Sequence, residues 1–205
     1  MNAVHKTVAM VALSLLPLSS PAARPTTFHL QAPRSFVRVH LGKTGLFAFA
    51  GDEHHIAVPV LRGEVVFDPD DPSSSSCDAE FATAQMKVDD PNLSDGDRAE
   101  VQRRMESSLV LDVPTFPRAS FKSTSVRATG PDRLEVVGNL TLLGRARPVT
   151  LDVQVQSTSP RFQARATARF KQTLFGIEPI SAAAGAVKVK DEVDVEIIVD
   201  AAPEP

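Results

Sequence analysis

The chain has 205 residues, of which 42% are hydrophobic and 23% charged, and its formal net charge is -3 at pH 7. This composition is ordinary for a globular protein of one or two domains. The charge indicates neither nucleic acid nor an anionic membrane as a partner. Trp and Tyr are both absent, so the usual stacking platforms for single-stranded nucleic acid are missing. We therefore exclude nucleic-acid binding.

The first residues are typical of an export signal. His5-Lys6 gives a weakly basic start, an apolar run extends from Val8 to Leu18, and Ser20-Pro21-Ala22 resembles a small-residue cleavage site. The apolar run is too short to span a bilayer of roughly 30 Å. We predict a leader over residues 1–22 and a periplasmic or secreted mature protein with no integral membrane segment.

Alternation of apolar and polar side chains predicts strands through the first half of the mature chain, at residues 35–41, 46–50, 56–60, 63–67 and 77–83. In the last of these, Cys77 shares the apolar face with Ala79 and Phe81, so we expect its thiol to lie inside. A single cysteine forms no intrachain disulfide. Two interpretations of it stay open, a small buried hydrophobe and a redox or ligating thiol, and we favour the first.

Residues 94–109 are the one segment with a helical pattern. Ser94 is the expected N-terminal cap, and Val101, Met105 and Leu109 recur at a spacing of four on one face. Prolines that follow soon afterwards prevent the helix from continuing.

From Phe116 to Val155 the chain alternates almost without interruption, and the second half predicts strands at residues 119–124, 134–142, 149–155, 162–170 and 187–199. An irregular Gly- and Ala-rich stretch at residues 176–185 precedes the last of them. Short turns, such as Gly144-Arg145, separate most of them. About eight strands with one apolar face each fit a closed barrel or a two-layer sandwich, and sequential hairpins favour the barrel. We predict an all-β fold: a single domain over residues 23–205, built as a closed antiparallel up-and-down barrel of about eight strands with one inserted α-helix.

Several segments resemble the YceI-like family of exported bacterial proteins, whose members are lipocalin-like barrels and include polyisoprenoid-binding ones. The resemblance lies in FPRASFKST at 116–124, GNLTLLGRARPVTL at 138–151, and residues 45–51, 63–69, 175–177 and 190–193. It implies the barrel and an apolar ligand, with isoprenoids among the candidates. Three positions depart from the family pattern: Arg34-Ser35 replaces a common His-Ser pair, Lys43 replaces a second histidine, and Asp97-Arg98 reverses a common Arg-Asp. The ligand therefore does not follow from the fold.

Asp52-Glu53-His54-His55 is the only cluster that resembles a metal site, with His40 and His29 as further candidates. Strand parity places His54 inward with Ile56, whereas His55 and His40 point outward. Asp52 and His54 could share one ion, but two ligands fall short of the three or four that zinc requires. We favour a polar loop over a metal site, and we expect no cofactor. No nucleophile elbow and no inward carboxylate pair occurs, so we expect no enzymatic activity.

The leading hypothesis is a barrel that binds or carries an amphiphilic ligand with an apolar chain, isoprenoid or another lipid. The row Ala164, Ala166, Ala168 supports it, because three small inward side chains leave volume for a facing bulky row or for a ligand. The predicted ligand-lining residues are Val39, Phe47, Phe49, His54, Phe121, Leu140, Val153, Ala166 and Phe170. Each of them equally fits plain core packing.

Two alternatives stay open. The first is a filled barrel that acts in the cell envelope through its outer surface, with Arg161, Arg165, Arg169 and Lys171 as the contact face. The second is a weak metal-binding protein that uses His54.

Overall fold

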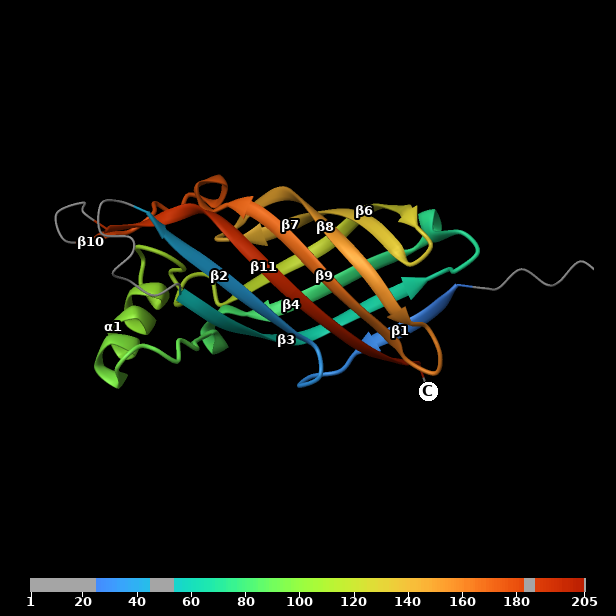
Figure 1. Cartoon of the computed structure of the whole chain (residues 1–205), viewed down its shortest axis with the longest axis horizontal. Coiled ribbons are helices and arrows are strands. Elements are labelled where there is room, and N and C mark those ends of the chain that lie inside the picture. Colours follow the sequence, from blue (N-terminus) through green and yellow to red (C-terminus); the bar gives the residue numbers. More distant parts are fainter. Residues whose placement is uncertain (1–24, 45–53, 183–186, 205) are drawn as a thin grey trace, which may run out of the picture.

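The computed structural model describes residues 25–44, 54–182 and 187–204 (Figure 1). In this part of the chain, eight strands close into an antiparallel barrel, in the ring order β11-β2-β3-β4-β6-β7-β8-β9. Their bounds are β2 (Phe36–Thr44), β3 (His54–Phe67), β4 (Ser76–Ala82), β6 (Arg118–Gly130), β7 (Arg133–Leu142), β8 (Arg145–Ser157), β9 (Phe162–Lys171) and β11 (Val187–Pro203). The predicted barrel is confirmed.

The barrel closes between β9 and β11. These strands pair from Lys171 opposite Glu192 to Phe162 opposite Ala201, which joins the two ends of the sheet. The remaining pairs in the ring are antiparallel as well, and most link strands that are neighbours in sequence. A closed ring leaves no free sheet edge, so its inward side chains surround a single interior.

One place in the ring is shared by two short strands. β1 (Thr26–Leu30) pairs with the end of β11 and with the end of β3, and β2 pairs with the same two strands further along. β1 and β2 therefore continue one another, separated by a loop at residues 31–35. The sequence pattern predicted no strand at β1. Two further pieces, β5 (Lys87–Val88) and β10 (Ser181–Ala182), extend the sheet beside β3 and β11.

A bulge in β3 explains a change of parity in the sequence. Before it, Val58 and Val60 are buried at even positions; after it, Val65 and Phe67 are buried at odd positions. The pairing of β3 with β4 shifts register at this point, beside the 39% exposed Leu61. An extra residue on one strand allows both halves to keep their apolar side chains inside.

The helix α1 (Asp95–Glu106) begins as predicted: the backbone N–H of Asp97 donates to the hydroxyl of Ser94. It ends earlier than predicted, because Ser107 terminates it and donates its own hydroxyl hydrogen to the carbonyl of Arg104. Leu109 was wrongly placed on the buried face and is 70% exposed. Leu111 is buried instead, and its N–H bonds to the carbonyl of Met105.

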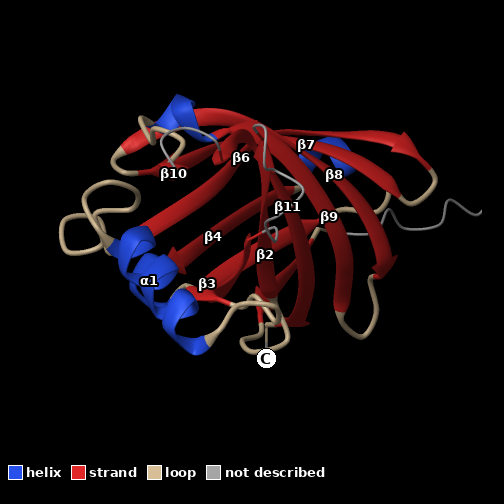
Figure 2. Ribbon diagram, turned by 60° about the vertical axis from the view of Figure 1, so that its left-hand side comes forward, coloured by secondary structure: helices blue, strands red, loops and turns tan. Residues whose placement is uncertain are grey.

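α1 lies at one end of the barrel (Figure 2), near the short strand β5. There the backbone N–H of Val88 donates to the side chain of Gln102, and the Gln102 amide donates to the carbonyl of Met86. These two bonds fix the helix to the segment that follows β4.

Candidate functional site: the barrel interior

The barrel interior contains a cavity of about 210 Å³ that is partly open. Its walls come from each of the eight ring strands, and besides Cys77 the polar side chains among them are those of Ser35, Ser75 and Ser76. An apolar cavity of about 150 Å³ is enough to hold a molecule of the size of benzene. Pockets for drug-sized ligands measure roughly 300–1,000 Å³. This cavity therefore fits a slim apolar group rather than a bulky polar one.

The small side chains of β9 account for much of this space. Ala164, Ala166 and Ala168 are 1%, 6% and 8% exposed, and all three line the cavity. Ala166 lies opposite Val153 on β8 and Ile197 on β11, which also line it. Interiors are normally close-packed, so a row of alanines without a filling partner leaves a void.

Six of the nine predicted ligand-lining residues lie around this cavity: Val39, Phe121, Leu140, Val153, Ala166 and Phe170. Phe47 and Phe49 lie outside the described residues, and the side chain of His54 is not described. That these residues contact a ligand stays a prediction.

Several further residues that line the cavity were not among the predicted ones. Leu30 and Met86 come from segments in which no strand was predicted, and Phe67 and Phe162 come from predicted strands. The inward parity of both phenylalanines was the signal that could have added them.

Aromatic rings stand at both ends of the cavity. At the end away from α1, the ring of Phe162 lies 5.3 Å from that of Phe67 and 5.6 Å from that of Phe28. At the other end, Phe170 and Phe175 meet edge to face at 5.5 Å. Such contacts stabilise each ring cluster beyond simple burial.

A polar network fixes the end away from α1. Ser35 is 2% exposed; its hydroxyl donates to the carbonyl of Asp200 at 2.9 Å and accepts from the N–H of Asp200 at 3.0 Å. The Asp200 carboxylate accepts from Arg161 Nε at 2.7 Å and from Gln163 at 3.1 Å. The bond from Arg161 lowers the pKa of Asp200 below its ordinary value. Ser35, the residue that follows the departure at Arg34 and itself matches the family's serine, thus joins the start of β2 to β11.

Cys77 contributes the one thiol of the chain, and it lines the cavity. Burial, reinforced by the neighbouring charge of Asp78, raises the pKa of this thiol to about 12. The thiolate is the reactive and metal-binding form. At neutral pH Cys77 is therefore protonated, as expected for a small buried hydrophobe.

The histidines form a pair on the outer surface. His40 and His55 lie opposite each other on β2 and β3, with ring centroids 4.7 Å apart and an edge-to-face arrangement. His40 Nε2 is 3.6 Å from a carboxylate oxygen of Glu196, and His29 lies apart, 4.0 Å from Glu64. No three metal-ligating side chains gather within the described ranges. Asp52 and the side chain of His54 lie outside them, so that predicted pair is not tested.

The predicted basic row on β9 is partly neutralised. Arg161 pairs with Asp200, and Arg169 pairs with Asp194 at 2.6 Å. Arg165 and Lys171 are exposed, and neither forms an ion pair among the described residues. The row as a whole is therefore not a uniform cationic face.

The geometry defines a class of protein: a lipocalin-like closed barrel of eight antiparallel strands with a hollow, apolar interior. Residues 28–201 match the family model of the YceI-like domain, and the chain belongs to this family. The "Protein YceI" sequences of Salmonella arizonae and Salmonella heidelberg are 34% identical to it over 116 residues, which are 57% of this chain. The match covers 52% of each relative, so the chain spans about half the length of these curated relatives.

Solved structures share the fold. BcnA of Burkholderia cenocepacia superposes with a TM-score of 0.66 at 19% identity, over 83% of this chain and 98% of that one. The YCEI protein of Campylobacter jejuni gives a TM-score of 0.56 at 14% identity, over 69% of this chain and 79% of that one. At these identities the likeness supports the barrel alone. Within the described ranges, no helix has the length and apolar character needed to cross a membrane.

Proposed function

We propose that this protein binds an amphiphile with an apolar chain, an isoprenoid or another lipid, and that it takes up a segment of that chain inside its barrel. The apolar cavity of about 210 Å³ is the observation that carries the proposal. Each methylene transferred from water into such a site contributes about 0.8 kcal/mol. A chain of moderate length thus gains enough free energy to bind without any charged partner.

The shape and lining of the cavity favour a chain over a polar ligand. Among the described residues no charged side chain lines it, and its serines lie at the β3–β4 connection and just before β2. A charged or strongly polar head group buried here would lose its hydration without compensation. The head group therefore stays at a mouth of the barrel while the chain enters.

We propose carriage rather than catalysis, with no cofactor. Cys77 is the strongest nucleophile along the cavity wall, and burial keeps its thiol protonated by raising its pKa. The serines of the wall have no histidine among the other lining residues to activate them. The ligand is held by burial alone, so it can be released unchanged.

The proposed place of action is the periplasm or the outside of the cell. The support is the predicted leader over residues 1–22, which lies outside the described residues. In an aqueous compartment, such a binding site shields the apolar chain of a lipid from water while the protein carries it.

Organic extraction of the protein purified from its native host tests the proposal. Mass spectrometry of the extract should show one lipid species in a ratio near one per chain. Ala166→Phe, prepared in parallel, should lose it, because the new ring occupies the cavity. An extract without lipid, or one with equal lipid from both preparations, would refute binding in the interior.

A further inference from the structure

An apolar face lies on the outside of the barrel, where the start of β2 runs between β11 and β3. Ile198 on β11 is opposite Phe36 on β2, which is opposite Pro59 on β3, and Leu61 follows on the same strand. Phe36, Pro59 and Ile198 are partly exposed and Leu61 is 39% exposed. Their sequence neighbours, such as Val37, pack into the core, whereas these four side chains do not. The fold thus brings together apolar residues from three strands outside the core cluster, and one of them, Ile198, also borders the interior cavity.

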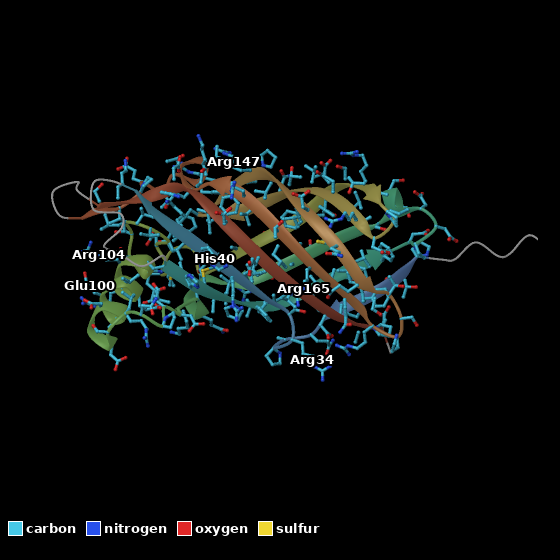
Figure 3. All side chains as sticks on the ribbon, viewed as in Figure 1. Arg34, His40, Glu100, Arg104, Arg147 and Arg165 are labelled. Carbon is cyan, nitrogen blue, oxygen red and sulfur yellow. The ribbon has the colours of Figure 1, made fainter. Side chains whose placement is uncertain are left out.

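Arginines border this surface. The guanidinium of Arg38 lies 5.2 Å from the centre of the Phe36 ring, and Arg165 on β9 is opposite Ile198. Figure 3 labels Arg165 and also Arg34, which lies on the loop just before β2. We call the four apolar residues with Arg34, Arg38 and Arg165 the Phe36 face.

These three arginines form no ion pair among the described residues. This sets them apart from Arg161 and Arg169, which are paired. Arg34 does interact with Asp200 at longer range, since its charge, after the bond from Arg161, helps to lower the pKa of that carboxyl. One exposed acid, Glu196, lies opposite Arg38, and its carboxylate is 3.6 Å from His40. The Phe36 face therefore carries an excess of positive charge on a chain whose formal net charge is -3.

We propose that the Phe36 face docks onto an anionic phospholipid surface. An apolar centre with a cationic border is the arrangement that binds the interface of an anionic bilayer: apolar side chains enter the head-group layer while arginines meet the phosphates. Isolated surface leucines need no explanation, but contiguous apolar side chains from three strands do. Val37 and Ile197, which alternate with the face, line the cavity, so docking brings the cavity wall to the membrane.

The proposal is independent of the ligand, since it concerns the outer surface. Flotation with vesicles of phosphatidylcholine containing about one third phosphatidylglycerol should recover the protein with the lipid, and pure phosphatidylcholine should recover little. About 1 M NaCl, which shortens the screening length to about 3 Å, should release it. Each arginine near an anionic surface contributes about fivefold in partitioning, so the triple variant R34Q/R38Q/R165Q should lose roughly 100-fold.

The matched control removes the same charge from another part of the barrel. K122Q/R133Q/R145Q changes exposed residues on β6, β7 and β8, and it should bind the anionic vesicles as the unchanged protein does. Because the chain has no Trp, Phe36→Trp gives a single fluorophore, whose emission should shift to shorter wavelength on anionic vesicles. Val137→Trp, on the outer side of β7, should not shift.

Three results would overturn the proposal. The first is the absence of binding to anionic vesicles, and the second is equal loss of binding in both triple variants. The third is a dimer of the unchanged protein in sedimentation velocity that is lost in R34Q/R38Q/R165Q, while the unchanged protein does not bind vesicles. That result would assign the face to self-association.

Discussion

Substitution of Ala166 by Phe perturbs the proposed site most directly. Ala166 is 6% exposed, lies near the middle of β9 and faces the cavity between Val153 and Ile197. A phenyl ring attached there extends into the void rather than into packed atoms. We expect the barrel to stay folded, with a change in stability below the roughly 1–3 kcal/mol of typical overpacking.

The cavity volume sets the size of the effect. At about 24 cal/mol per Å³ of unfilled volume, a cavity of about 210 Å³ corresponds to about 5 kcal/mol that a well-fitting apolar group can recover. At about 0.8 kcal/mol per methylene, that equals about six methylenes. The phenyl ring brings about as many carbons, so Ala166→Phe should weaken binding by roughly a thousandfold or more.

Isothermal titration with amphiphiles of one head group and increasing chain length measures this. For the unchanged protein, affinity should rise about fourfold per methylene and level off after about six buried methylenes. Ala166→Phe should lose both the affinity and the dependence on length, whereas Thr167→Phe, on the outer side of β9, should keep them. Equal binding by the two variants, or affinity that ignores chain length, would show that the ligand is not inside the barrel.

Three further predictions follow from single residues. With its pKa at about 12, the thiol of Cys77 should react with iodoacetamide at about pH 8 roughly a thousandfold more slowly in the folded protein than in urea; equal rates would contradict its burial. The lowered pKa of Asp200 stabilises the folded protein at neutral pH, and this stabilisation is lost as the pH falls below about 4. The free energy of unfolding in urea should therefore depend less on acid pH in Asp200→Asn than in the unchanged protein. An unchanged pH profile would contradict the role of Arg161. Gly138→Ala should lower the free energy of unfolding by about 1–3 kcal/mol, because a Cβ there would lie 2.6 Å from the carbonyl oxygen of Lys122. An unchanged free energy of unfolding would show that β6 and β7 can move apart at that point.

The sequence predicted those parts of the fold that depend on local patterns. Alternation in β7, β8 and β9 assigned Leu140, Val153 and Ala166 to the interior, and the structure places all three on the cavity wall. The cap at Ser94 was equally local and is confirmed. In each case one strand or one helix turn contains the whole signal, so distant contacts are not needed to read it.

Other features depend on contacts between distant segments and could not be predicted. β1 is too short to show a clear alternation. It forms a strand because it pairs with the ends of β11 and β3, beyond the residues of these strands that pair with β2. Leu109 continues a helical spacing, yet Ser107 ends the helix and Leu111 takes the buried position. The local hydrogen bonds of Ser107 end the helix even though the apolar i, i+4 spacing continues to Leu109.

The Phe36 face shows the same limit on the surface. Phe36, Pro59 and Ile198 occupy the polar side of three strands as isolated apolar residues, and each is unremarkable in its own segment. Only the register of β11, β2 and β3 places them side by side. For the same reason the charge composition gave no indication of a membrane surface, since three arginines without an ion pair among the described residues do not make a net charge of -3 positive.

A crystal structure of the protein purified from its native host without delipidation tests the central claim most directly. The account predicts continuous elongated density along the barrel axis, in contact with Val39, Ala166 and Phe170, with its polar end at a mouth of the barrel. An empty interior, or one closed by inward side chains that fill the space beside Ala166, would contradict it.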